Sequence, residues 1–389
     1  MPQVRIAVGF LALSLFLQSH EDGTSAVLVN LPDKLFLVIG AALLVPRSIS
    51  LLGFRKHWML LIAVYWLISV LYLPVHLLAE MNDTPLRFQP GLFIPGSLFL
   101  LTAISIVGLN QQATTLEELP FGNVFAAITA TFFISYVLFL FGIDIDWGLD
   151  HSQFSNLPRI QGLMVEPSYS TFIFFIFFLL STRWIRWVFF LAAMLGLSST
   201  FFAFLLLYAL IWHRRYLIPI AICAPLFWNA PTVAKYRNAA EFIVSGESSV
   251  GAERVSSVFQ AMNIDYSLFG KGLGSSIYFA GFDSTIQPSI MLILYEAGVV
   301  GVVLFLGLTI SLFISDRITT TQKQAIFAAW FFWFVNSGSA PIFWTVLALV
   351  LRINPDRSGD EEGQYIAGSD TEMSRDVGAD ATTGMSHAP

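Results

Sequence analysis

Long apolar runs recur along the first 352 residues of this 389-residue chain, and polar stretches separate them. A helix crosses the hydrocarbon core of a bilayer with about 20 mostly apolar residues. The chain is 56% hydrophobic and 12% charged, whereas soluble chains are about 45–50% apolar and about 25% charged. This pattern disfavours a cytosolic enzyme, a nucleic-acid-binding protein and a disulfide-rich scaffold.

The apolar runs predict an all-α, polytopic integral membrane protein with about twelve transmembrane helices. They form one membrane domain, residues 1–352, which a tail of residues 353–389 follows. We interpret the first run as a span, because no convincing cleavage site follows it. The predicted spans are 4–19, 35–46, 58–78, 92–109, 121–142, 169–182, 187–197, 199–212, 216–231, 289–314, 324–336 and 340–352.

The segment 187–212 is long for one membrane crossing and short for two, with Gly196 to Thr200 in its middle. Lys and Arg concentrate in short cytoplasmic loops. With a hairpin in this segment, the short inner segments hold eleven Lys and Arg, and the longer outer segments hold seven. A single crossing would instead place Arg214 and Arg215 outside. The charges therefore predict a hairpin, with both termini in the cytoplasm.

The net charge of −6 originates in the tail, where eight acidic residues between Asp356 and Asp380 outnumber two arginines. The tail is rich in Gly, Ser, Thr and Asp, so it cannot bury enough apolar surface to fold, and we expect disorder there. The single cysteine, Cys223, lies in an apolar stretch. One cysteine excludes internal disulfides and multi-thiolate metal sites.

Two predicted outer segments, residues 143–168 and 232–288, are much longer than the inner loops. The inner loops contain no Walker or Gly-rich nucleotide loop, which disfavours ATP-driven chemistry. Long loops on a rigid scaffold are frequent locations of function. We therefore expect any chemistry to face away from the cytoplasm.

The first outer segment ends in a charged run, Arg159 to Tyr169, that leads directly into a Phe-rich span. Ionisable residues at the edge of the hydrocarbon are costly and are functional candidates by default. Pro167 suits the first turn of a helix, whose N-terminus favours Glu166 as an anion. Two interpretations stay open: Arg159 and Glu166 act on a substrate, or they pair with each other or cap the span. Tyr169 is either an interface anchor or a substrate contact.

The second outer segment contains Arg254 and, further on, three glycines around Lys271, in the run from Gly270 to Gly274. Such glycines can form a backbone concavity that holds an anion, with the lysine as a point charge. The alternatives are a plain flexible turn and a solvated Arg254. Gln287 then precedes the next span, inside which Glu296 needs a partner, through a salt bridge or a helix contact.

Together these motifs resemble the Wzy-like O-antigen polymerase and O-antigen ligase superfamily. The resemblance rests on R-x-x-G-x-x-x-E-P-S at Arg159 to Ser168, an outer-segment arginine, G-x-G-L-G at Gly270 to Gly274, and L-x-E-x-G-x-x-G at Leu294 to Gly301. It covers roughly residues 120–352, and the order of the motifs is more specific than any one of them. It implies a glycosyltransferase at the outer face of the bacterial inner membrane, without metal or other cofactor.

One departure from the family separates two activities. Ligases of this superfamily carry a His-Asn pair just before the last motif, where this chain has Gln287 and Pro288. His151 lies in the first outer segment instead. The chain therefore resembles the polymerases more closely, and a ligase is the alternative. A polysaccharide or lipid transporter is the third hypothesis, although no internal repeat is evident and the polar residues cluster in the outer segments.

The implied reaction requires an acceptor hydroxyl to attack an anomeric carbon while a diphosphate departs, and fixed cations stabilise that leaving group. The candidate catalytic residues are Arg159, Glu166 and Arg254, and the substrate-binding candidates are Lys271, Gln287 and Tyr169. Glu166 either orients or deprotonates the acceptor, or it holds Arg159 in place. The implied partners are a polyprenyl-diphosphate-linked oligosaccharide, membrane lipids, a chain-length regulator and a flippase, with no nucleic acid.

Overall fold

The computed structural model describes the chain in segments, to which the structural statements below refer. They are residues 2–17, 31–48, 61, 64–65, 67, 115–143, 145, 147–151, 158–164, 167–182, 184–196, 198–216, 218, 267–272, 289–316, 318–335, 340–353 and 355. Most of these residues are helical, as the apolar runs predict. Two short strands are the exception, and they form a hairpin.

The described elements coincide with nine of the predicted apolar runs. In chain order they are α1 (Pro2–Phe16), α3 (Leu31–Ser48), η2 (Leu116–Glu118), α6 (Gly122–Leu140), β1 (Leu149–Asp150), β2 (Arg159–Ile160), α7 (Pro167–Leu180), α8 (Ile185–Leu195), α9 (Ser199–Trp212), η3 (Arg214–Tyr216), α14 (Ser289–Ile314), α15 (Thr320–Val335) and α16 (Ala340–Val350). The runs 58–78, 92–109 and 216–231 lie wholly or mostly outside the described residues, as does the tail beyond residue 355.

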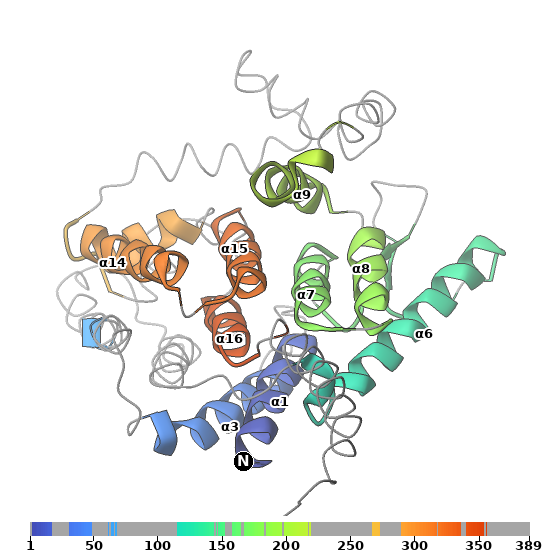
Figure 1. Ribbon diagram of the computed structural model, residues 1–389, viewed down its shortest axis with the longest axis horizontal. Coiled ribbons are helices and arrows are strands. Elements are labelled where there is room, and N and C mark those ends of the chain that lie inside the picture. Colours follow the sequence, from blue (N-terminus) through green and yellow to red (C-terminus); the bar gives the residue numbers. More distant parts are fainter. Residues whose placement is uncertain are drawn as a thin grey trace, which may run out of the picture.

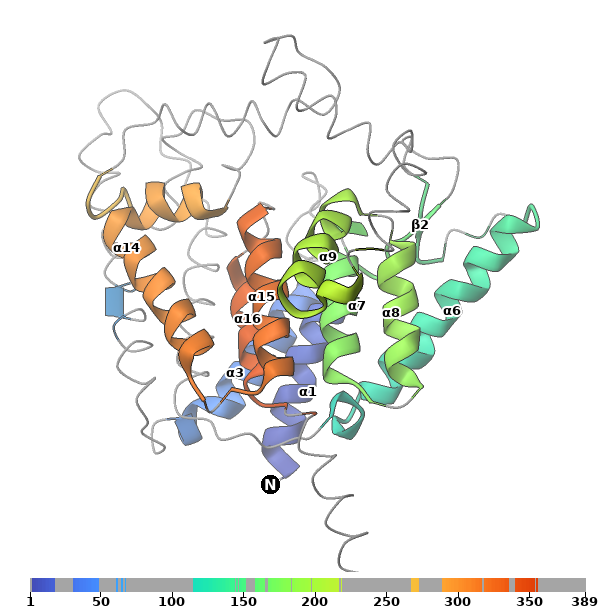
Figure 2. The ribbon, with the colours of Figure 1, turned by 45° about the horizontal axis from the view of Figure 1, so that its top comes forward.

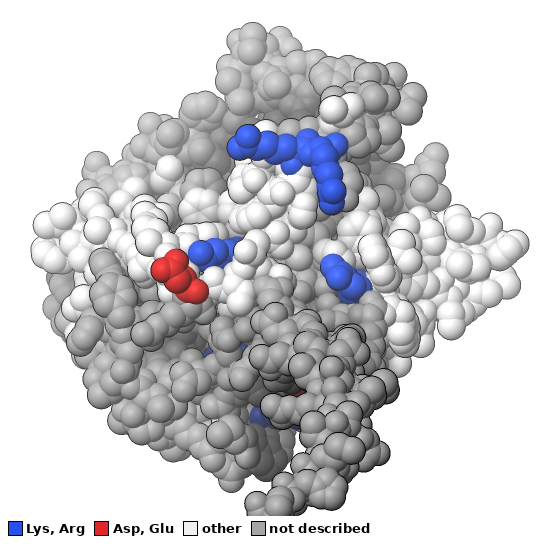
Figure 3. Space-filling model, viewed as in Figure 1, with Lys and Arg blue, Asp and Glu red and all other residues white. Residues whose placement is uncertain are grey.

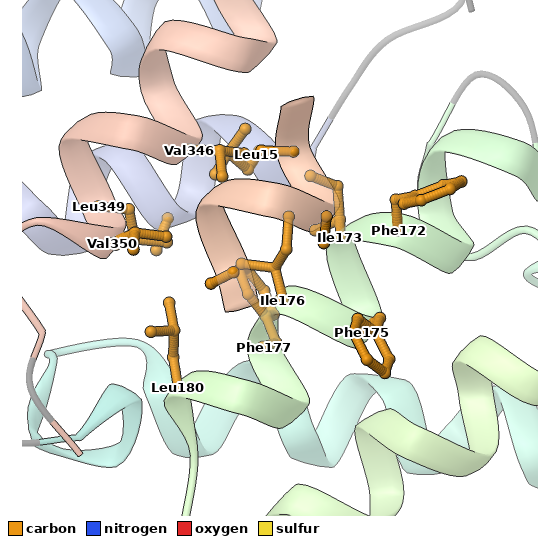
Figure 4. Packing of buried hydrophobic residues seen from close by; sticks show 14 of the residues in the cluster. Leu15, Phe172, Ile173, Phe175, Ile176, Phe177, Leu180, Val346, Leu349 and Val350 are labelled. Carbon is orange, nitrogen blue, oxygen red and sulfur yellow. The ribbon is translucent and has the colours of Figure 1, made fainter. Parts of the chain in front are cut away.

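Helix α7 lies in the middle of the described bundle (Figure 1) and packs against α1, α8, α9 and α15. Every side chain from Phe172 to Phe177 is almost fully buried. A helix that is apolar on all sides is expected to be buried on all sides. Figure 4 shows part of the resulting core, with side chains from α1, α7 and α16.

Helices α6 and α14 lie at opposite sides of the bundle (Figure 2). Within the described residues they are the two helices long and apolar enough to cross a membrane, over Gly122–Leu140 and Ile290–Ile314. Both expose large apolar side chains, such as Ile134 on α6 and Val303 on α14, whereas Thr129 of α6 is buried. Soluble monomers rarely expose large continuous apolar faces. The two helices therefore have both the length and the surface of membrane-crossing helices.

The apolar segment 187–212 forms two helices, α8 and α9, with a break at the predicted position. The Ser198 hydroxyl caps α9 by accepting a hydrogen bond from the Phe201 amide at 3.4 Å. Such a cap satisfies an amide that has no partner in the first turn of a helix. Gly196 lies against α7, where an added Cβ would be 2.1 Å from the Thr171 hydroxyl. The interruption predicted between the two helices is confirmed.

Ring contacts join α9 to α7. Phe172 of α7 contacts Phe201 of α9, and Phe175, one turn further along α7, contacts Tyr208. Phe172 also contacts Phe204, and Phe175 also contacts Phe201, so α9 packs on this part of α7. That α8 and α9 cross the membrane as a hairpin stays a prediction.

Candidate functional site

Arg159 lies in a short β-hairpin at the end of the first predicted outer segment. Strands β1 and β2 pair antiparallel, with Asp150 directly opposite Arg159. The Arg159 Nε and Nη2 atoms donate hydrogen bonds to Asp150 Oδ2 at 3.1 and 2.5 Å. The two side chains are 25% and 22% exposed, so the ion pair is partly shielded from water. Asp150 therefore orients the guanidinium group that the sequence analysis selected.

Two glycines place the hairpin against the helices. Gly148 and Gly162 both have a φ of 69°, in the left-handed region that favours glycine. The Gly148 carbonyl accepts hydrogen bonds from the amides of Gln161 and Gly162, at 2.9 and 3.0 Å. An added Cβ would lie 2.3 Å from the Phe132 ring at Gly148, and 3.1 Å from the Phe174 ring at Gly162. The base of the hairpin thus packs directly on α6 and α7.

The residues after Arg159 anchor the hairpin to the bundle. Ile160 is fully buried, and its carbonyl accepts a hydrogen bond from the Ser170 hydroxyl of α7 at 3.3 Å. The Tyr169 ring meets Phe332 of α15 edge-on, with the ring centroids 4.9 Å apart. Tyr169 therefore packs between α7 and α15, and a role as a substrate contact stays a prediction.

Asp150 is the site residue that sequence reasoning missed. The sequence signal for Asp150 is weak. It consists of Gly148, two residues before Asp150, and Gly162, three residues after Arg159, which are placed as at the base of a hairpin. Glu166, which we expected to pair with Arg159 or to act beside it, lies outside the described residues. Arg254 and Gln287 lie outside them too. The roles assigned to these three residues therefore stay predictions.

The predicted span 289–314 is not one uninterrupted helix. Helix α14 breaks at Gly298, which has a φ of 68° and a ψ of −172°. Figure 2 shows the helix changing direction along its length. The predicted span 289–314 is therefore present as a helix with a break inside it, and the sequence analysis did not foresee this break. Glycine adopts a backbone conformation that other residues rarely reach.

The 267–272 segment pairs with the backbone groups that this break leaves without helical partners. An uninterrupted helix would bond three amides after the break, those of Val299, Val300 and Gly301, to three carbonyls before it, those of Tyr295, Glu296 and Ala297. The replacement amide-to-carbonyl bonds are Val299 to Ser267 at 3.4 Å, Val300 to Leu268 at 3.1 Å, Lys271 to Tyr295 at 3.0 Å and Gly272 to Glu296 at 2.8 Å. Four of these six groups are therefore paired with the 267–272 segment, and an apolar environment favours such pairing.

Two glycines allow the two backbones to approach this closely. An added Cβ at Gly270 would lie 2.3 Å from the Glu296 carbonyl oxygen, and one at Gly298 would lie 2.4 Å from the Gly270 amide nitrogen. The glycine motif of the outer segment and the glycine motif of α14 therefore pack directly against each other, through Gly270 and Gly298. The described part of this run, Gly270 to Gly272, is bonded to α14, and the rest of the run lies outside the described residues.

Lys271 is held at the break through its main chain. The predicted anion-binding concavity is wrong in one respect, because the amides of Lys271 and Gly272 already donate to carbonyls of α14. The Lys271 ammonium group lies 5.5 Å from the centroid of the Tyr295 ring, within the range of a cation–π contact. Its side chain, rather than the neighbouring amides, stays the candidate for an anion.

The hairpin and the 267–272 segment both lie towards the top of the bundle in Figure 2, and the N-terminus lies at the bottom. Figure 3 shows a few separate groups of Lys and Arg on a surface that is otherwise mostly uncharged. On the face drawn in Figure 3, which is the face seen in Figure 1, the described Lys and Arg form separate groups and no continuous basic band of the kind that binds nucleic acid.

Within the described residues, no three His, Cys, Asp or Glu side chains group closely enough to hold a metal ion. Comparisons with protein-family models, with curated proteins and with solved structures find no match. The function is therefore inferred from the residues and their geometry.

Proposed function

We propose that this chain is a polymerase of lipid-linked polysaccharide repeat units. It transfers a polyprenyl-diphosphate-linked glycan onto the next lipid-linked unit, at the outer face of the bacterial inner membrane. The observation that carries the proposal is that two basic motifs far apart in sequence lie towards the same end of the bundle (Figure 2): Arg159 at the side of α6 and α7, and Lys271 at the opposite side, on α14. Each supplies a cation at the ends of apolar helices, where the diphosphate of a lipid-linked glycan would lie.

The surface of the described helices supports a multi-spanning membrane protein. Leu191 of α8 and Leu206 and Leu210 of α9 are exposed, although all three are strongly apolar. Trp184 and Trp187 are exposed beside the predicted cytoplasmic loop at the start of α8. Tryptophan is enriched at the level of the lipid headgroups. This distribution is the one expected of helices that face lipid, and about twelve spans fit the whole sequence.

Contacts between predicted cytoplasmic segments support the proposed topology. Arg5 Nη2 lies 3.2 Å from Glu118 Oε2, which joins the N-terminus to η2. The Thr182 amide donates to Glu117 Oε1 at 2.7 Å, which joins η2 to the loop between α7 and α8. These contacts bring together three segments that the charge rule assigns to the cytoplasmic side. The N-terminus lies at the opposite end of Figure 2 from the Arg159 hairpin.

The proposed reaction uses Arg159 as a preoriented cation. The acceptor hydroxyl attacks the anomeric carbon, a new C–O bond forms, and the bond from that carbon to the diphosphate oxygen breaks. The polyprenyl diphosphate leaves with the electron pair, and arginine forks stabilise its charge. Because Asp150 orients the guanidinium before substrate arrives, less ordering is needed in the transition state. Arg254 is the second cation, and Glu166 accepts the hydroxyl proton or holds Arg159.

The test is a deletion strain of the source bacterium, complemented with variants. We expect the deletion to accumulate single repeat units capped on the acceptor, and Arg159→Ala and Arg254→Ala to do the same at normal protein levels. Arg214→Ala, an exposed arginine in a predicted cytoplasmic loop, is the matched control and should extend chains normally. Long polymer that stays unattached to its carrier would indicate a ligase instead. Unchanged long-chain polysaccharide in the deletion strain would refute the proposal.

A further inference from the structure

A tyrosine from a distant part of the sequence contacts both sides of the α14 break. The Tyr65 hydroxyl donates to the Phe269 carbonyl at 3.2 Å and to the Ala297 carbonyl. Phe269 belongs to the 267–272 segment, and Ala297 is the last residue before the break. One hydroxyl therefore bridges the two backbones that the glycines bring together. Figure 2 shows the described part of the 58–78 run, in blue, beside the upper part of α14.

The second glycine of the helix motif, Gly301, lies against both the Ala297 side chain and this ring: an added Cβ would lie 2.4 Å from the Ala297 Cβ. An added Cβ at Gly301 would lie 3.2 Å from Tyr65 Cε1, closer than most such contacts allow. Gly298 admits the 267–272 segment, and Gly301, three residues on, admits the tyrosine. The G-x-x-G spacing in α14 thus serves two neighbouring contacts on one helix.

We propose that Tyr65 is a positioning residue that holds the 267–272 segment on the break of α14 and thereby fixes Lys271. The Lys271 backbone is bonded to α14, so the location of its ammonium group follows that of the segment. Tyr65 touches no substrate in this scheme and acts through the two carbonyls that it bridges. Its effect on the reaction rests on the function proposed above, whereas its effect on the segment does not.

Hydrogen exchange tests whether Tyr65 holds the 267–272 segment on α14, without any assumption about the reaction. Tyr65→Phe keeps the ring against Gly301 and removes only the hydroxyl. We expect the four amides that join the 267–272 segment to α14 to exchange about fivefold faster, because one hydrogen bond no longer opposes local opening. The sample is the purified full-length protein in detergent, analysed by mass spectrometry. Tyr208→Phe, the same change in a ring packed on α7, is the matched control and should leave these amides unchanged.

Rescue by a disulfide tests the link to the reaction. In the complemented deletion strain we expect Tyr65→Phe to shorten the polysaccharide at normal protein levels in the membrane. Leu268 and Val300 are joined by a backbone hydrogen bond of 3.1 Å. Cysteines at both positions, in a Cys223→Ala background, serve as the link, and mass spectrometry of the oxidised protein first establishes that the disulfide has formed. We expect the oxidised cysteine pair to restore chain length to the Tyr65→Phe protein, and a reductant to remove that effect.

Three results would overturn the inference, and each has its own signature. Unchanged exchange in Tyr65→Phe would show that the hydroxyl does not hold the segment. Faster exchange with normal chain length would show that holding the segment does not position Lys271 for the reaction. Shortened chains that the disulfide does not restore would show that Tyr65 acts elsewhere. Failure of the proposed function is distinguishable, because the deletion strain itself would then make normal polysaccharide.

Discussion

The two cations that the proposed function uses, Arg159 and Lys271, lie at opposite sides of the bundle and are held in different ways. Arg159 is oriented through its side chain, by a carboxylate on the paired strand. Lys271 is fixed through its main chain, by bonds to the carbonyl groups of a broken helix. The first arrangement requires the side chains of Arg159 and Asp150. The second requires that Gly270 and Gly298 have no side chain. The Arg159 region should therefore be sensitive to changes of its charged side chains. The Lys271 region should be sensitive to any side chain added at its glycines.

Gly298→Ala should have the largest effect. Its Cβ would lie 2.4 Å from the Gly270 backbone nitrogen, at a residue with a φ of 68°. We expect a loss of about 3 kcal/mol or more in the free energy of unfolding, measured by thermal unfolding in detergent. Gly142→Ala is the matched control, because its φ is 80° and its Cβ would meet no atom within 4 Å. It should lose about 1 kcal/mol, and equal losses would show that the contact with the 267–272 segment is unimportant.

Gly148→Ala should rank second and, unlike Gly298→Ala, should be rescued by a second substitution. Its Cβ would lie 2.3 Å from the Phe132 ring, which is a side chain rather than backbone. We expect a loss of about 2 kcal/mol in the free energy of unfolding. Adding Phe132→Leu should give a double variant about 1 kcal/mol more stable than the sum of the single losses. Strict additivity in the same unfolding measurement would contradict this difference between the two regions.

The helices could be predicted from the sequence, but the contacts that build the site could not. Apolar length, the Gly196 to Thr200 stretch and the distribution of Lys and Arg are signals in the sequence itself, so α8 and α9 were expected close to where they lie. Arg159 and Lys271 stood out because charges beside apolar runs are costly. The partner of Arg159 depends on a turn that brings Asp150 across from it. The break at Gly298 has no local signal either, because glycine is common in membrane helices and the flanking residues are apolar.

Asp150→Asn should have a small effect on stability and a larger one on the reaction. The ion pair is about a quarter exposed, so we expect a loss of less than about 1 kcal/mol in the free energy of unfolding. Chain extension should fall about tenfold, because the guanidinium loses its orientation. The chain-length distribution in the complemented deletion strain gives the measurement. If Asp150→Asn costs as much in an Arg159→Lys background as alone, Asp150 does not act through Arg159.

Lys271→Met should have the smallest effect on the fold, because the hydrogen bonds that join its backbone to α14 stay in place and the long side chain stays beside the Tyr295 ring. We expect a change within about 0.5 kcal/mol in the free energy of unfolding. Chain extension should nevertheless fall about tenfold or more, because the cation is lost, and Lys271→Arg should retain more of it. A loss of stability as large as that of Gly298→Ala would show that the side chain holds the segment. Normal extension would remove Lys271 from the site, whereas a stable protein with defective extension would separate the lysine's role in the reaction from the role of its backbone in the fold.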